Sequence, residues 1–278
     1  MSFTYSAVAI AERRVGKLGA GLFAGRPGAV AERNLRNLKS SSGIMFVAGF
    51  VEPVLILIAF GYGVGGMVGK ITDASGHTYS YIAYIMPALL ATSAMNGAIF
   101  DSTWNVYFKM QFAKLYNAML ATSLGTLDVA LGEIGWAMFR GTIYASSFVL
   151  VVSLLGLIPS LAGALLAIVA ATLVAFAFAS VGMGITSYVK SFQQLDMVTF
   201  FLLPMFLFSG TLFPLSLFPG WLQAIIQALP LRQSIELVRD CMNLNLSWAL
   251  AGHFAYFAVM IIGGLFFTPR RLTALFLR

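Results

Sequence analysis

Charged side chains are scarce in this chain of 278 residues. Asp, Glu, Lys and Arg make up 10% of it, whereas 59% of its residues are hydrophobic. A soluble protein carries about 25% charged residues, because its surface must face water. The deficit of charge excludes an ordinary soluble domain. Because the apolar residues gather in long tracts, the sequence predicts an all-α polytopic membrane protein.

Cysteine and histidine are almost absent, since the chain holds only Cys241, His77 and His253. One thiol cannot form a disulfide framework, and three scattered residues do not make a metal site. No serine or threonine has a plausible partner base, so we expect no catalytic residue, no metal and no cofactor in this chain. The first 43 residues lack an apolar core segment, so we expect no cleavable signal peptide.

Six apolar tracts are long enough to cross a membrane, which takes about 20 residues. They cover roughly 44–68, 81–100, 128–157, 161–186, 197–213 and 248–268. Asp101 is expected to end the second span, and Pro269 with Arg270 and Arg271 the sixth. The six spans form one membrane domain, 44–268, between an N-terminal segment, 1–43, and a tail, 269–278.

The net charge of +7 does not indicate a nucleic-acid partner, because the basic residues gather at the chain ends and in short loops. An even number of spans places both ends on one side of the membrane. If that side is the cytoplasm, most of the 17 Lys and Arg residues lie there, as the positive-inside rule requires. We therefore predict a multi-pass protein of the plasma (inner) membrane with cytoplasmic termini.

A basic segment after Pro27-Gly28 has the pattern of an amphipathic helix lying in the membrane interface. Its apolar face holds Ala31 and Leu35. The residues expected to contact the interface are Leu35, Arg36, Leu38 and Lys39. A solvated, partly disordered tail is the alternative reading of the same composition.

The polar loop 101–127 contains a second amphipathic pattern, which predicts a cytoplasmic helix within it. Its apolar side chains recur at helical spacing, with lysines on other faces. The residues concerned are Phe108, Lys109, Phe112, Lys114, Leu115 and Met119. Such a helix would rest on the membrane or dock a cytoplasmic partner.

Four charged residues fall within or at the edge of predicted spans: Glu52, Asp128, Glu133 and Arg140. Intramembrane charges are suspected of function by default, and a proton relay is the functional hypothesis. The alternative is a structural ion-pair network inside the bundle. Glu133 and Arg140 are seven residues apart, so they share a helix face without pairing directly and would meet polar groups of neighbouring spans.

The stretch "GYGVGG" (61–66) matches the pattern G-x-G-x-x-G, but it ends an apolar span instead of following a strand. Gly61, Gly65 and Gly69 are spaced as in close helix packing, which is the favoured interpretation. The following Lys70 belongs to no phosphate-binding loop, because the required first glycine and Ser/Thr are missing. No nucleotide-binding site is predicted.

An uncharged tract from Met197 to Leu231 is too long for one span and contains four prolines. Pro214 and Pro219 block a continuous helix, and residues 220–229 are too few to cross. We predict re-entrant helices in the outer leaflet over 214–240, ending in a charged outer helix that closes the outer mouth. The residues assigned to this gate are Phe213, Pro214, Pro219, Trp221, Gln223, Gln227, Pro230 and Arg232.

Four ordered segments resemble the type-2 ABC exporter permeases, in particular the NodJ-like branch of drug and lipo-oligosaccharide exporters. They are "EPVLILIAFGYGVG" (52–65), "YIMPALLATSAMNGAIFDSTW" (84–104), "MLATSLGTLDVALGEIGWA" (119–137) and "FLFSGTLFPLSLFPGWLQAIIQALPLRQSIELVR" (206–239). The last is similar to the most recognisable signature of that family. The resemblance runs from about residue 27 to the end.

The resemblance implies a permease subunit without enzymatic activity, paired with a second copy or a related permease. A cytoplasmic ATPase subunit, two per complex, would hold the ATP and Mg²⁺. Residues 105–122 would then be the coupling helix, and the cargo an amphiphilic drug, glycolipid or lipo-oligosaccharide. The rival interpretation is an ion-coupled secondary transporter that uses Glu133 and Arg140, although no convincing inverted repeat supports it.

Overall fold

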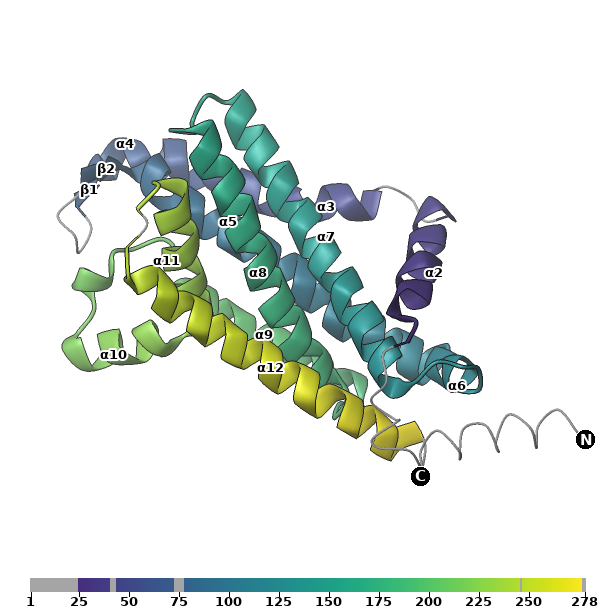
Figure 1. The fold of residues 1–278 in the computed structure, drawn as a ribbon. Helices are drawn as coiled ribbons and strands as arrows, with labels where there is room; N and C mark the ends of the chain where they lie inside the picture. Colours follow the sequence, from purple (N-terminus) through teal and green to yellow (C-terminus); the bar gives the residue numbers. More distant parts are fainter. Residues whose placement is uncertain (1–24, 41–43, 73–77, 246, 277–278) are drawn as a thin grey trace, which may run out of the picture.

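A computed structural model describes residues 25–40, 44–72, 78–245 and 247–276 (Figure 1). Within these ranges, five helices are long and apolar enough to cross a membrane: Val51–Val68, Tyr81–Phe112, Thr126–Leu154, Leu161–Thr186 and Ala249–Phe276. A shorter apolar helix, α9, covers Phe192–Phe208. An all-α polytopic membrane protein is thereby confirmed, whereas the count of six spans and the cytoplasmic termini stay predictions.

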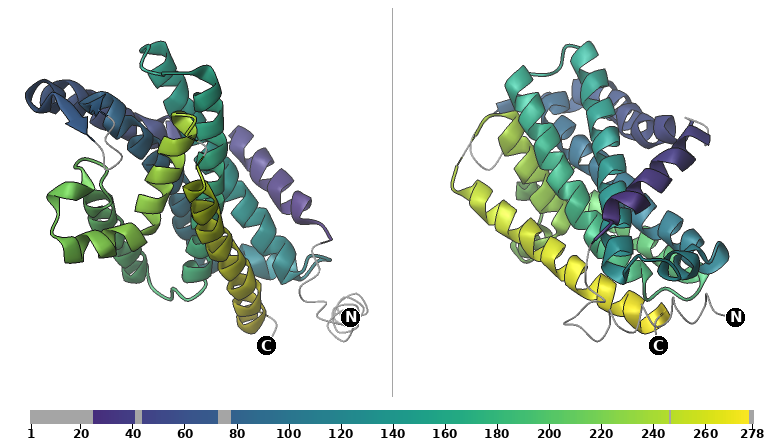
Figure 2. Two further views of the ribbon diagram at one scale, coloured as in Figure 1. Left: turned by 60° about the vertical axis from the view of Figure 1, so that its left-hand side comes forward. Right: turned by 45° about the vertical axis from the view of Figure 1, so that its right-hand side comes forward.

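The centre of the bundle is formed by α5 (Tyr81–Phe100), α7 (Thr126–Leu154) and α8 (Leu161–Thr186). These helices run beside one another, while α12 (Ala249–Phe276) crosses over α8 (Figures 1 and 2). Helix α3 (Ile44–Ile58) and α2 (Pro27–Ser40) lie on the other side, against α7. Helix α5 belongs to the longer apolar helix Tyr81–Phe112. In the most apolar stretch of that helix 83% of the residues are buried, compared with 11% in the corresponding stretch of α12.

The first span continues beyond α3 through a π-helical segment, Ala59–Val64, and α4, Gly65–Val68. A methyl group on Gly61 would lie 2.8 Å from Cγ1 of Ile82 on α5, so only a glycine admits this approach. The close helix packing predicted for the glycine motif is confirmed at this position. A short antiparallel hairpin, β1 (Lys70–Thr72) and β2 (Thr78–Ser80), then leads into α5.

Asp101 does not end the second span, contrary to the prediction. The helix continues to Phe112 and includes two π-helical segments, Asp101–Asn105 and Phe108–Phe112. A charged side chain ends a buried helix when its charge must reach water. The Asp101 carboxylate instead forms an ion pair with Arg140 inside the bundle. Its partner lies 39 positions further along the chain, and local sequence patterns do not reveal such a partner.

The single amphipathic helix predicted over 105–122 is also wrong. The extension of α5 stops at Phe112, Lys114 adopts a left-handed conformation with φ 46°, and a separate helix, α6, covers Leu115–Leu120. Left-handed geometry breaks a helix because it turns the chain out of the hydrogen-bond ladder. The apolar residues at helical spacing therefore belong to two elements with different directions.

The last helix does not stop at Pro269 but continues to Phe276. A proline removes one backbone donor and bends a helix without necessarily ending it. The side chains of the two following arginines contact aromatic rings. The Arg271 guanidinium lies over the ring of Tyr188, and that of Arg270 over the ring of Phe266. Neither charge forces the chain to leave the helix.

The segment between α9 and α12 contains a 3-10 turn, Leu215–Leu217, then α10, Gly220–Ala228, and α11, Pro230–Met242. Helix α11 (Pro230–Met242) was predicted as a charged outer helix, and that location stays a prediction. It packs against both α5 and α8 and buries Leu231, Ile235 and Val238 between them. Of its charged residues, Arg232, Glu236 and Arg239 form ion pairs, and Arg239 is itself buried against Tyr84 of α5.

Candidate functional site

A cavity of about 780 Å³ opens between α3, α5 with its extension, α7 and α9. Its walls are mostly apolar, with Ile56, Leu89, Met95, Leu202 and Phe206 among them. Six polar or charged side chains also line it: Glu52, Thr92, Asn96, Arg140, Tyr144 and Thr199. This mixture is typical of a site for a ligand with apolar and polar parts.

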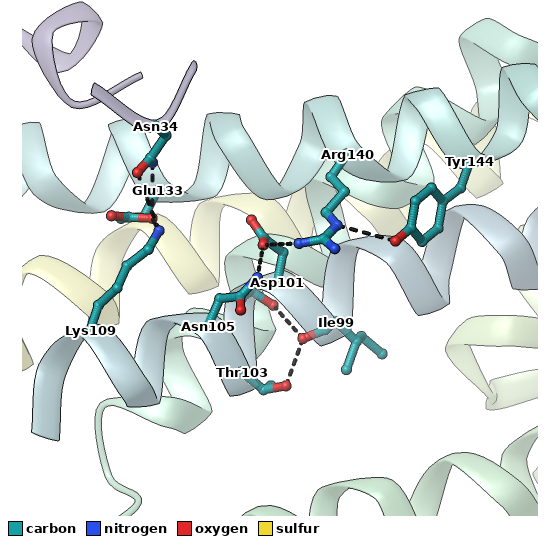
Figure 3. A network of polar contacts seen from close by, with 10 residues as sticks. Asn34, Ile99, Asp101, Thr103, Asn105, Lys109, Glu133, Arg140 and Tyr144 are labelled. Atoms are coloured by element: carbon teal, nitrogen blue, oxygen red, sulfur yellow. Dashed lines mark hydrogen bonds and ion pairs between the residues drawn. The ribbon is translucent and has the colours of Figure 1, made fainter. Parts of the chain in front are cut away.

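The first of two buried ion pairs lies beside this cavity, where Arg140 of α7 meets Asp101 of the α5 extension (Figure 3). Nη1 of Arg140 is 2.8 Å from Oδ1 of Asp101, and both side chains are at least nine-tenths buried. Nε of Arg140 donates to the Tyr144 hydroxyl at 3.2 Å, and Asn105 donates to the Asp101 carboxylate. The pair is therefore held in a hydrogen-bonded network, as a buried pair must be.

The second ion pair connects the same two helices further along, where Lys109 lies 2.6 Å from Oε2 of Glu133 (Figure 3). Nδ2 of Asn34, on α2, also donates to this carboxylate oxygen at 3.2 Å. The Glu133 side chain is 1% exposed. Glu133 and Arg140 thus contact neighbouring elements instead of each other, as predicted.

Asp128 has a structural position at the start of α7. Its two carboxylate oxygens accept the backbone N–H groups of Gly125 and Arg26, each at 2.9 Å. One side chain therefore caps α7 and holds the chain that leads into α2. The cap gives this charge a structural role.

Asp128→Ala should lower the free energy of unfolding by about 1–2 kcal/mol, the range measured when a helix cap is removed. Thermal unfolding of the purified protein in detergent would measure the change. Asp128→Asn is the matched variant, because its amide oxygen still accepts one of the two hydrogen bonds, so it should lose less. Equal losses for both variants would contradict the capping role.

The predicted coupling residues separate into exposed and buried groups. Phe108 and Phe112 are 43% and 66% exposed, and their ring centroids lie 5.2 Å apart. Lys114 is also exposed and Leu115 is half-buried. Lys109 instead points inward to Glu133, and Met119 is buried.

Tyr116 lies fully buried in α6, next to these residues. Burial raises the pKa of its phenol well above the ordinary value, and the nearby Glu133 and Asp101 carboxylates raise it further. The hydroxyl therefore stays neutral, and the side chain can fill this buried junction between α6 and the bundle without adding charge. Tyr116 was not among the residues predicted from the sequence.

Helix α2 forms within the segment predicted to be an interfacial helix, and it contacts the bundle through residues other than the predicted apolar face. Val30 and Asn34 are buried against α7, whereas Leu35 is 46% exposed and Arg36 pairs with Glu32 at 2.5 Å. Leu38 and Lys39 fall outside the side chains that the structure describes. The open Leu35 face remains available for a membrane surface.

The residues assigned to the outer gate differ in their exposure. Phe213 and Trp221 are 49% and 69% exposed, Pro219 and Gln227 are exposed, and Pro214 and Pro230 are half-buried. Gln223 donates to the carbonyl of Phe218 at 2.7 Å. Glu236 pairs with Arg232 and with Arg239, at 2.6 and 2.8 Å.

Two tyrosines of α5 hold the turn that follows α9, a role that sequence reasoning missed. The Tyr84 hydroxyl donates to the carbonyl of Gly210 at 3.0 Å, and that of Tyr81 to the carbonyl of Leu212 at 3.3 Å. Asp101 and Asn34 were missed as site residues too. Asp101 could have been recognised, because it is an acid at the end of a long apolar tract and another span contains an arginine without a local partner. Nothing in the sequence around Asn34 indicates a site residue.

Comparison with known proteins gives concordant matches. A model of the family described as "ABC-2 type transporter" matches residues 28–243, from α2 to the end of α11. Nodulation protein J of Sinorhizobium fredii (strain NBRC 101917 / NGR234) is 33% identical over 215 residues, covering 77% of this chain and 80% of that protein. Nodulation protein J of Rhizobium leguminosarum bv. viciae is 32% identical over 77% of this chain and 81% of its own. The inner membrane transport permease YadH of Escherichia coli (strain K12) is 23% identical over 67% and 72% respectively.

Proposed function

Because this chain belongs to the ABC-2 type transporter family, we propose that it is the permease of an ATP-driven exporter for an amphiphilic cargo. The cargo class would be a drug, a glycolipid or a lipo-oligosaccharide, carried across the plasma membrane. A permease of this family has no ATPase domain of its own. ATP would be hydrolysed with Mg²⁺ on a separate cytoplasmic ATPase subunit, two per complex.

The cavity beside Arg140 is the observation that supports an amphiphilic cargo. Its volume of about 780 Å³ lies within the range of about 300–1,000 Å³ typical of small-molecule sites. The apolar walls would accept hydrocarbon, and the polar side chains of α5 and α7 would accept a head group. A small inorganic ion would need more polar coordination than these walls offer.

The open side of the cavity supports a second permease in the complex. Its wall includes α3 and α9, and α9 exposes several large apolar side chains. Phe200 and Phe201 are 68% and 66% exposed. A second copy or a related permease packed there would enclose the cavity, and the cargo would then pass between the two subunits.

The two buried ion pairs suggest how force from the ATPase would reach the cavity. Phe108 and Phe112 are exposed at the end of the α5 extension, where an ATPase subunit could bind them. Lys109 and Asp101 tie this extension to α7. A displacement of the exposed end would therefore move α7, including Arg140 at the cavity wall.

The double substitution Phe108→Ala and Phe112→Ala should reduce the amount of ATPase that co-purifies with the permease by about tenfold, which corresponds to about 1.4 kcal/mol of contact energy. Exposed aromatic anchors carry much of the energy of such interfaces. The matched control is Phe254→Ala with Phe267→Ala on α12, where 45% and 58% exposed rings lie far from the coupling segment in sequence. Undiminished co-purification of the coupling double mutant, with the thermal stability of wild type, would contradict the assignment.

The rival interpretation, an ion-coupled secondary transporter, gains no support from the geometry of Glu133 and Arg140. Each is engaged with an opposite charge on the α5 extension. A group that must bind and release a proton in each cycle would have to break such a pair every time. A structural ion-pair network accounts for both residues.

A further inference from the structure

The charges at the cavity do not balance. Arg140 lines the wall, but its charge is compensated by Asp101 at 2.8 Å, so this pair contributes almost no net charge (Figure 3). Glu52 of α3 also lines the cavity and is exposed. None of the ion pairs formed by the described residues includes Glu52. The cavity therefore presents one uncompensated carboxylate.

A carboxylate inside a membrane span is costly unless it meets water or an opposite charge. Glu52 lies within Val51–Val68, the window that qualifies as the first span. Its α3 neighbours Ile56 and Pro53 also line the cavity, so its carboxylate shares this space with apolar walls. A positively charged group on a ligand would satisfy the carboxylate while its hydrocarbon part contacts those walls.

Aromatic rings complete the chemistry of the same space. Phe100, Trp104 and Phe206 line the cavity together with Tyr144. Arg140 already lies over the rings of Phe100 and Tyr144, with its guanidinium carbon 5.6 and 5.8 Å from their centroids. Trp104 and Phe206 come from the α5 extension and α9 and remain as further ring surfaces. Ring faces attract organic cations, and carboxylate with aromatic rings is the usual combination for substituted ammonium groups.

We propose that this cavity binds a cationic amphiphile, and that Glu52 is the residue that selects for its positive charge. This proposal rests on the proposed transport function and specifies the class of its cargo. An anionic amphiphile would meet the Glu52 carboxylate and would find Arg140 already engaged by Asp101 and Tyr144. The positive group would be an amine or onium centre, carried either by a hydrophobic small molecule or by an aminophospholipid head group.

Two ions of the same shape and opposite charge, tetraphenylphosphonium and tetraphenylborate, provide the test. Equilibrium binding of each would be measured on the purified full-length chain in phosphatidylcholine nanodiscs, with empty nanodiscs subtracted. The ratio of the two affinities removes contributions from lipid partitioning, because these are equal for wild type and variants. Glu52→Gln should shift this ratio against the cation by about tenfold, the factor that corresponds to loss of one partly solvated charge contact.

Three variants make the result specific. Glu52→Asp keeps the charge and should keep most of the cation preference, whereas Glu32→Gln removes an exposed carboxylate on α2 and should leave the ratio unchanged. Trp104→Leu should weaken the cation more than the anion. The proposal is overturned if wild type does not bind tetraphenylphosphonium, or if Glu52→Gln changes the affinity ratio by less than twofold. It is also overturned if Glu52→Gln changes binding only because permease dimers dissociate.

The source of the cation is resolved by repeating the measurement in phosphatidylethanolamine nanodiscs. If the lipid amine occupies the cavity, wild type should bind tetraphenylphosphonium several-fold more weakly there than in phosphatidylcholine, and Glu52→Gln should show no such difference. If the ligand is a small molecule, the two lipids should give equal affinities. Either result supports a cationic ligand.

Failure of the transport function would be recognised separately. ATP-driven accumulation of tetraphenylphosphonium in inverted vesicles would be measured with the partner ATPase present. Cation-selective binding without any ATP-driven transport would contradict the exporter function and leave the cavity assignment intact. ATP-driven transport that ignores Glu52→Gln would overturn the role of Glu52 and leave the exporter function intact.

Discussion

Arg140→Met should lower the free energy of unfolding by about 3–5 kcal/mol, because it leaves the Asp101 carboxylate buried without its counter-charge. Asp101 is 2% exposed, and its remaining polar contact among the described residues is with Asn105. Methionine matches the length of arginine and keeps most of the packing, so the loss reports the charge. Reversible unfolding in mixed detergent micelles would measure it.

The matching double variant separates charge from shape. Asp101→Leu combined with Arg140→Met removes both charges and should recover most of the loss, since an apolar pair of similar volume often replaces a buried ion pair without penalty. Arg36→Met provides the exposed control. Its ion pair with Glu32 is 78% and 60% exposed, and its loss should stay below about 1 kcal/mol. A double variant as unstable as Arg140→Met alone would show that Asp101 is not the reason.

Gly264→Ala should destabilise the contact between α8 and α12 by about 3 kcal/mol, the upper range for overpacking a tight core. The added methyl group would lie 2.5 Å from the carbonyl carbon of Ser180 and 2.6 Å from its carbonyl oxygen. Backbone atoms cannot rotate away, so one helix must shift. Loss of this contact would be measured as a lower melting temperature and a lower yield of folded protein.

The neighbouring glycine supplies the control for this prediction. A methyl group on Gly263 has nothing within 4 Å, so Gly263→Ala should be neutral or slightly stabilising, because alanine favours a helix by about 1 kcal/mol over glycine. The two variants differ by one position and have the same composition. If both behave alike, the close approach of α12 to α8 does not hold in the membrane.

These two sites describe complementary properties of the bundle. Small residues let α8 and α12 meet at the backbone, and buried ion pairs hold the α5 extension against α7. The π-helical turns at Asp101–Asn105 and Phe108–Phe112 lie beside the two ion pairs. Such segments mark positions where a helix departs from its regular ladder, often at functional sites. The extension is thereby both tied to α7 and locally irregular.

Sequence alone was sufficient for the class of the protein and for most helices. Apolar length predicted the span at 161–186 with the bounds that α8 has, and Pro214 and Pro219 correctly divided the tract after the fifth span. These features depend on composition and on restrictions within a few residues, which a single chain displays directly. Asp101 and Pro269 misled the prediction because breaking signals act only where no tertiary contact compensates them.

The tertiary structure alone decided which charges meet and where space remains. Lys109, expected to face an ATPase, turns to Glu133, and α11, predicted as a charged outer helix, packs against both α5 and α8. Such outcomes depend on how each helix is rotated and shifted against its neighbours, and helical periodicity is the same for every such arrangement. The cavity and its uncompensated Glu52 arise in the same way, because four elements distant in sequence must converge to form them.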